Sequence, residues 1–181
     1  MTIAFETQRL SVVEIVDGVA LSEHSDLLER VPAMLTPAVV EHLPPYFHGV
    51  NSRGAADMWL ERMLRESRLL QVKSKTHEIM GFLFIYVENE HHAHIGYLLA
   101  QAYWGKGLAT ELLQGFIGAA ANTESWLTLV GGVDQAYTAS TKLLEKLGFT
   151  AQKQDGNSPV FYEYRLSRAI PEQVSQKGAV P

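Results

Sequence analysis

The 181-residue chain contains no cysteine, which excludes structural disulfides, thiolate metal sites and a cysteine nucleophile. Basic residues are also scarce: 15 Lys and Arg against 20 Asp and Glu give a formal charge of −5. The sequence therefore lacks the excess of positive charge that is typical of nucleic-acid-binding proteins. No apolar run reaches the ~18 residues of a membrane span, and the N-terminus lacks the charged-then-apolar pattern of a signal peptide. We therefore expect a cytoplasmic protein with neither a nucleic-acid nor a membrane partner.

Apolar residues are plentiful, at 46% of the chain, which is enough for a sizeable core at this length. The chain length favours one domain. From residue 167 onward the apolar pattern fades. We therefore expect a single domain over residues 1–166 and a loose C-terminal tail over residues 167–181.

Apolar periodicity predicts alternating strands and helices. The predicted strands are residues 7–16, 69–73, 79–87, the segment around 95–99, 126–133, 149–153 and 160–166, the last two forming a hairpin across 155–157. The predicted helices are broken pieces within 19–50, then 52–67, 106–121 and 138–147. This order predicts a mixed sheet, with antiparallel strands first and a βαβαβ half second, in which the uniformly apolar segment 79–87 lies in the middle.

A short glycine loop joins one of these strands to the helix that follows it. Gly105 and Gly107 bracket Lys106. Such a loop presents unpaired backbone N–H groups at the positive end of a helix, which is typical of a phosphate site. The spacing matches neither a dinucleotide-binding fingerprint nor a P-loop. The alternative is a tight strand-to-helix connection without a ligand.

Residues 103–111, Tyr-Trp-Gly-Lys-Gly-Leu-Ala-Thr-Glu, resemble the acyl-CoA-binding motif of the GNAT N-acetyltransferase superfamily. They are most similar to the branch that contains the ribosomal-protein N-terminal acetyltransferases. Residues 139–149 resemble the second signature of that branch, and Thr-Gln-Arg-Leu at residues 7–10 resembles the opening of its first strand. The order and spacing of the three are more specific than any one of them.

The resemblance implies an α+β fold, an α/β/α sandwich. Its GNAT-like sheet is mixed, mostly antiparallel, of about six to seven strands, and flanked by helices. Two central parallel strands splay apart in this fold, and the pantetheine arm of acetyl-CoA lies in the gap. The residues implied in cofactor binding are Ile95, Tyr97 and Leu98 for the pantetheine, and Trp104, Gly105, Lys106, Gly107, Leu108, Ala109 and Thr110 for the pyrophosphate. Trp104 stands where the superfamily motif has Gln or Arg, and Lys106 is either a cofactor contact or a solvated lysine.

Three residues are candidates for the chemistry. His94 occupies the position of a glutamate common in the branch, and an imidazole can accept a proton directly or through water. Ser140 matches a serine that assists the leaving thiolate in the branch, and Tyr137 replaces a usual asparagine. Leu144 stands where many superfamily members have a tyrosine. A hydrogen-bonded sheet histidine and a helix-start hydroxyl remain the alternatives for His94 and Ser140.

A metal site is not predicted, because no third ligand accompanies His92 and His94. Tyr46, Phe47 and His48 are expected in a loop that walls the acceptor pocket together with residues 52–66. We expect transfer of an acetyl group to a primary amine, either a protein N-terminus or a small molecule, by direct attack in a ternary complex. The alternatives are a non-catalytic acyl-CoA-binding or sensor domain of the same fold and a nucleotide-phosphate binder. A monomer and a homodimer both remain open.

Overall fold

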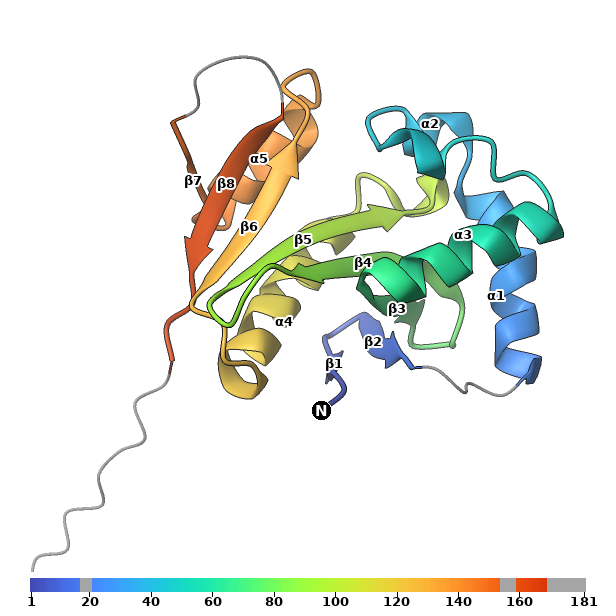
Figure 1. Cartoon of the computed structure of the whole chain (residues 1–181), viewed down its shortest axis with the longest axis horizontal. Coiled ribbons are helices and arrows are strands. Elements are labelled where there is room, and N and C mark those ends of the chain that lie inside the picture. Colours follow the sequence, from blue (N-terminus) through green and yellow to red (C-terminus); the bar gives the residue numbers. More distant parts are fainter. Residues whose placement is uncertain (17–20, 154–158, 169–181) are drawn as a thin grey trace, which may run out of the picture.

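The computed structural model describes residues 1–16, 21–153 and 159–168. An eight-stranded sheet in the order β1-β2-β3-β4-β5-β6-β8-β7 forms the centre of the molecule, with helices on both faces (Figure 1). The strands are β1 (Ala4–Glu6), β2 (Leu10–Ile15), β3 (Arg68–Ser74), β4 (Ile79–Val87), β5 (His92–Leu99), β6 (Thr128–Val133), β7 (Thr150–Ala151) and β8 (Val160–Arg165). The helices are α1 (Leu21–Met34), α2 (Pro37–Val40), α3 (Arg53–Glu66), α4 (Leu108–Thr123) and α5 (Thr138–Lys146), with short 3₁₀ turns η1 (Pro45–Phe47) and η2 (Gln101–Tyr103).

Every strand pair is antiparallel except β5 and β6, which are parallel. The expected α+β sandwich with a mostly antiparallel sheet is therefore confirmed. The sheet has one strand more than expected, because β1 is too short to show a periodicity in the sequence. Its three residues pair with β2, from Ala4 opposite Val13 to Glu6 opposite Ser11.

The two faces of the sheet bury separate apolar cores. One core lies under α4 and α5 and includes Leu83 and Phe116, while the other lies under α1, α2 and α3 and includes Phe82 and Trp59. The strand β4 contributes alternate residues to both cores, which explains its uninterrupted apolar sequence. The prediction that residues 79–87 form a central strand is confirmed.

The helical segment before residue 50 is more regular than its sequence suggests. Helix α1 runs for 14 residues with Pro32 inside it, although proline removes a helix hydrogen bond. Burial of one apolar face, which includes Val31 and Met34, outweighs that loss. Residues 46 and 47 lie in the 3₁₀ turn η1 rather than in an open loop. The predicted hairpin turn at 155–157 and residues 169–181 of the predicted tail lie outside the described residues.

Close contact between β4 and β5 requires a glycine at position 81. A Cβ atom built on Gly81 would lie 2.1 Å from the carbonyl oxygen of Leu98 and 2.9 Å from Leu99 Cδ2. The register of β3 and β4 shifts beside this residue, between Val72 and Lys73. The absence of a side chain at Gly81 thus allows the last residues of β5 to lie where they do.

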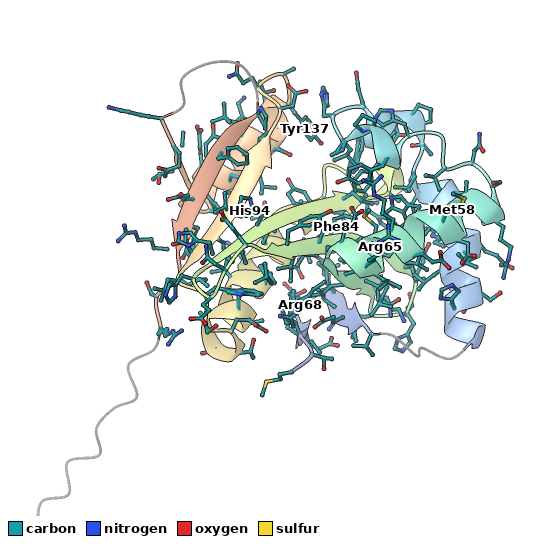
Figure 2. All side chains as sticks on the ribbon, in the orientation of Figure 1. Met58, Arg65, Arg68, Phe84, His94 and Tyr137 are labelled. Carbon is teal, nitrogen blue, oxygen red and sulfur yellow. The ribbon has the colours of Figure 1, made fainter. Side chains whose placement is uncertain are left out.

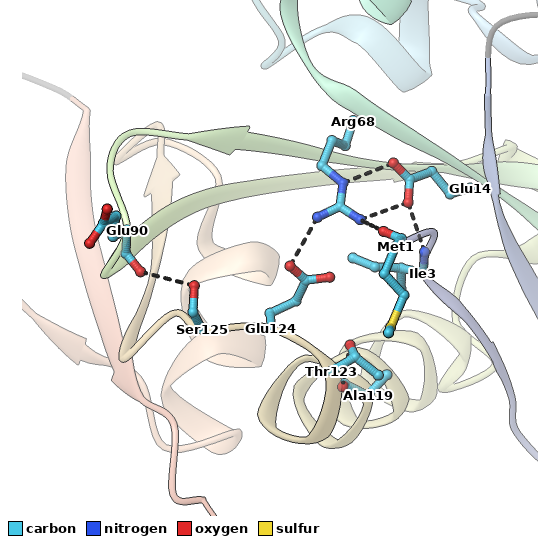
Figure 3. Close-up of polar contacts among 9 residues, drawn as sticks. All are labelled: Met1, Ile3, Glu14, Arg68, Glu90, Ala119, Thr123, Glu124 and Ser125. Atoms are coloured by element: carbon cyan, nitrogen blue, oxygen red, sulfur yellow. Dashed lines mark hydrogen bonds and ion pairs between the residues drawn. The ribbon is translucent and has the colours of Figure 1, made fainter.

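Arg68 on β3 connects three distant parts of the chain (Figure 3). Its guanidinium donates two hydrogen bonds of 2.8 Å to Glu14 on β2, one of 3.1 Å to Glu124 after α4, and one of 3.0 Å to the carbonyl of Met1. Burial would raise the pKa of the Glu14 carboxyl, but hydrogen bonds from Arg68 and from the backbone N–H of Ile3 hold it below its usual value. These contacts fasten the end of α4 to the first half of the sheet.

Candidate active site

The parallel strands β5 and β6 separate halfway along their length. They pair only from His92 to Ile95 on β5 and from Thr128 to Gly131 on β6, and then diverge as the arms of a V (Figure 1). A cleft of about 610 Å³ opens at this point. Its walls include residues 95–99 of β5, residues 131–134 at the end of β6, the start of α5 and the loop before α4.

The glycine loop closes one end of the cleft. Gly105 and Gly107 both adopt left-handed backbone conformations, with φ of +70° and +73°. Gly107 is the N-cap of α4 and has no side chain to accept from the first-turn N–H groups, which have no acceptor within the helix. A Cβ atom on Gly105 would meet nothing within 4 Å, so the loop has open space beside it. The loop and helix terminus therefore have the geometry of an anion site.

Arg9 and Thr7 brace this loop from the start of the chain. Arg9 donates to the Lys106 carbonyl at 2.9 Å and to the Glu111 carboxylate at 2.6 Å, and the Thr7 hydroxyl donates to the same carboxylate at 2.6 Å. Burial would raise the pKa of Glu111, but these hydrogen bonds lower it overall. The two sequence signatures, at 7–10 and 103–111, thus contact each other in the fold. Their spacing in the sequence did not reveal that Arg9 supports the glycine loop.

Two other residues of the loop differ in exposure to the cleft. Trp104 lines it and donates from its indole N–H to the Leu99 carbonyl at 2.8 Å, which fixes the loop to the end of β5. Lys106 is exposed and does not line the cleft, whereas its backbone carbonyl is held by Arg9. The residues predicted for the cofactor that do line the cleft are Ile95, Tyr97, Leu98, Trp104, Gly105, Gly107, Leu108, Ala109 and Thr110.

Two side-chain contacts cross the cleft beyond the point where strand pairing ends. The hydroxyl oxygens of Tyr97 on β5 and Ser140 in the first turn of α5 lie 3.2 Å apart. Burial raises the pKa of Tyr97, and the bond to Ser140 opposes this effect in part. Further out, the ring of His42 stacks on Tyr137 with centroids 4.7 Å apart. The cleft therefore has a hydroxyl pair inside and an aromatic pair at its mouth.

A family model for the acetyltransferase (GNAT) domain matches residues 20–150 of the chain. The chain belongs to the GNAT acetyltransferase family. The match covers the splayed strands, the glycine loop and all of α5. No curated protein sequence matches the chain significantly.

Solved structures share the fold of this GNAT domain at low sequence identity. The ribosomal L7/L12 α-N-protein acetyltransferase RimL, in complex with coenzyme A, has a TM-score of 0.72 and 16% identity over 92% of this chain and 98% of that chain. The microcin C7 self-immunity acetyltransferase MccE, in complex with acetyl-CoA and AMP, has a TM-score of 0.69 and 17% identity over 87% of this chain and 93% of that chain. YncA of Salmonella typhimurium, with its cofactor acetyl-CoA, has a TM-score of 0.60 and 17% identity over 91% of this chain and 98% of that chain. At these identities the likeness shows a shared fold.

His94 of this GNAT domain lies on β5 near the point of the V (Figure 2). Its Nε2 atom is 3.0 Å from a Glu88 carboxylate oxygen, and its ring is nearly perpendicular to that of Phe161, with centroids 6.0 Å apart. It does not line the cleft itself. Strand alternation places it on the same face as Gly96, which does line the cleft, about 7 Å further along.

The three residues predicted for the acceptor wall lie apart from the cleft. Phe47 is buried between Trp59 and Phe84, and the Arg62 guanidinium covers the ring of Tyr46 at 4.0 Å. The ring of His48 bonds the carbonyl of Leu43. The residues of this region that line the cleft are Val39, His42 and Leu43.

No pattern in the sequence marks His42, because two of its partners, Tyr137 and Asp134, come from a distant part of the chain across the cleft. Its Nδ1 atom lies 3.7 Å from a carboxylate oxygen of Asp134, which follows β6. Among the described residues, no group of three or more His, Asp or Glu side chains could hold a metal ion. Over the same part of the chain, no helix has the length and apolar content to cross a bilayer.

Proposed function

We propose that this GNAT protein transfers an acetyl group from acetyl-CoA to a primary amine, either a protein N-terminus or a small-molecule amine. One observation carries the proposal: a continuous cleft runs from the point where β5 and β6 part to the N-terminus of α4. One end is suited to a diphosphate and the other to a reacting carbonyl.

The residues of the cleft fit acetyl-CoA. The first-turn N–H groups of α4 would hold the diphosphate, and the open space beside Gly105 allows its close approach. On the side facing β6, the β5 backbone beyond Ile95 has no strand partner among the described residues, so its N–H and C=O groups can bond the amides of the pantetheine arm. When bound, the thioester supplies the activated acetyl group.

The acceptor amine must lose a proton, since only the neutral amine is a nucleophile. We propose His94 as the base. It would act through a water molecule, because its side chain does not line the cleft, whereas Gly96 on the same face of β5 does. The Glu88 carboxylate, 3.0 Å from Nε2, orients the imidazole and stabilises it after protonation. Because the chain has no cysteine, we propose direct attack in a ternary complex without an acyl-enzyme.

The proposal is tested by two measurements on the purified chain. Calorimetry with CoA, ATP and NAD identifies the bound ligand, and a thiol-release assay with acetyl-CoA is run against N-terminal peptides, polyamines and aminoglycosides. We expect CoA binding and turnover with one amine class. Binding of CoA without turnover on any amine would support the non-catalytic acyl-CoA-binding domain instead. Binding of ATP or NAD but not CoA would overturn the proposal.

A further inference from the structure

We propose that Tyr97 is the proton donor for the departing thiolate, and that Ser140 orients its hydroxyl. The inference rests on the proposed function. It assigns to Tyr97 a role in chemistry beyond its place on the cofactor-binding strand.

The geometry places the Tyr97 hydroxyl between the two arms of the V. Tyr97 belongs to the part of β5 that no longer pairs with β6, and its ring packs on the core under α4 and α5. The hydroxyl reaches across to Ser140 in the first turn of α5, at 3.2 Å. Both residues line the cleft. A sulfur atom carried between the arms would therefore lie close to this hydroxyl pair.

The other hydroxyl groups that line the cleft belong to residues with different surroundings. The Tyr103 hydroxyl lies 3.4 Å from an Arg30 guanidinium nitrogen, and Thr110 lies in the first turn of α4 at the diphosphate end. The ring of Tyr137 is stacked on His42 at the mouth. Within the described chain, Tyr97 and Ser140 form the hydroxyl pair that joins the two walls of the cleft.

Of the two hydroxyls, the phenol is the better acid, because a tyrosine loses its proton far more readily than an aliphatic alcohol. When Ser140 donates to the phenol oxygen, the Tyr97 proton is free for a second acceptor in the cleft. Burial, with a smaller contribution from Tyr137, raises the pKa of Tyr97. The phenol therefore keeps its proton at neutral pH until an anion forms beside it.

The proton balance of the step is complete. The amine lone pair forms the N–C bond, the C–S bond breaks, and its electron pair goes to sulfur. The Tyr97 hydroxyl gives its proton to that sulfur, which leaves as a thiol. The amine nitrogen loses one proton to His94 or water, and solvent returns one proton to the Tyr97 phenolate. No oxidant or metal is needed.

The first test measures binding rather than turnover. The thiolate absorbance of bound CoA is titrated with pH in the unaltered protein and in Tyr97→Phe, with Tyr164→Phe as the matched control. Tyr164 packs on Phe149 and Gly148 outside the cleft. We expect the pKa of the bound thiol to rise by about one to two units in Tyr97→Phe and to stay constant in Tyr164→Phe.

The second test uses an acetyl donor with a poorer leaving group. In single-turnover experiments at saturating acetyl-CoA, Tyr97→Phe should slow transfer about 10²-fold. The loss should be larger with the oxygen-ester analogue of acetyl-CoA, whose leaving alkoxide needs the proton more. Ser140→Ala should lose less than Tyr97→Phe.

The outcomes separate this inference from the proposed function. If the unaltered protein does not bind CoA, the proposed function fails. If it binds CoA and transfers acetyl groups, but Tyr97→Phe has the same bound-thiol pKa and an equal loss with both donors, Tyr97 is not the donor. A larger loss in Ser140→Ala than in Tyr97→Phe would assign the proton to Ser140.

Discussion

His42 and Tyr137 stack across the mouth of the cleft, with their ring planes 15° from parallel. The stack joins the segment after α2 to the start of α5. Stacked rings contribute about 0.5–1.5 kcal/mol beyond their buried area. We expect a double-mutant cycle of His42→Ala and Tyr137→Ala, measured by urea unfolding, to give a coupling free energy in that range. In the parallel cycle of Tyr137→Ala with His91→Ala, in an exposed turn, the effects should add. Additivity in the first cycle would show that the stack does not contribute to stability.

Gly107 should be required for cofactor affinity. In Gly107→Ala the new methyl group projects beside the α4 terminus from a left-handed backbone, which costs about 1–2 kcal/mol in folding stability. We expect CoA affinity to fall at least about tenfold in calorimetry, and Gly107→Val to abolish it. Gly118→Ala, in the same helix with open space around it, should instead stabilise the fold by about 0.5–1 kcal/mol and leave affinity unchanged. Undiminished CoA binding by Gly107→Val would contradict the placement of the diphosphate.

Replacement of His94 tests the proposed base. In His94→Gln we expect kcat to fall about 10²-fold near neutral pH and the acidic inflection of the pH–rate profile to disappear, while CoA affinity stays constant. Glu88→Gln should show a smaller loss in the same direction, because the imidazole loses its orienting carboxylate. His92→Gln, whose ring bonds Asn89, is the control and should keep the full profile. An unaltered pH–rate profile in His94→Gln would show that His94 is an ordinary hydrogen-bonded residue of the sheet and not the base.

The Arg68 cluster should make stability depend on acid pH. The pKa of Glu14 is lower in the folded chain than in the unfolded chain, so its contribution is present above the unfolded value and is lost as pH falls through the folded value. Arg68→Met leaves two part-buried carboxylates without this partner, which should cost about 2–4 kcal/mol near neutral pH. In urea unfolding the difference should shrink progressively as pH falls below the ordinary glutamate value of about 4.3. Arg65→Met, at an exposed ion pair, should cost under about 1 kcal/mol throughout; an equal cost for both variants would refute the argument.

Elements with a strong apolar pattern could be predicted from the sequence to within about two residues. The strand at 79–87 is confirmed at both ends, and the helix expected at 106–121 is observed at Leu108–Thr123. The sequence missed β1, because three residues have no measurable period, and it missed the continuity of α1, because Pro32 resembles a break.

The site was less predictable than the fold, since its decisive contacts join residues far apart in the chain. The glycine loop could be found because its residues are adjacent. The brace of Arg9 on Glu111 spans 102 residues, and the pairing of Tyr97 with Ser140 spans 43. No local pattern encodes such distances. The residues expected at the acceptor wall, Tyr46, Phe47 and His48, do not line the cleft; Phe47 belongs to the core under α1, α2 and α3, and Tyr46 packs against that core.

Gly81 has a consequence for enzyme engineering. Any side chain there would push the end of β5 away from β4 and toward the opposite arm, since it would overlap the Leu98 carbonyl. In the binding mode that we propose, the acyl chain lies between the two arms, so the residue at position 81 would affect the space for a longer acyl chain from the opposite side of β5. A mutant library aimed at broader donor range should keep this position fixed and vary the far wall instead.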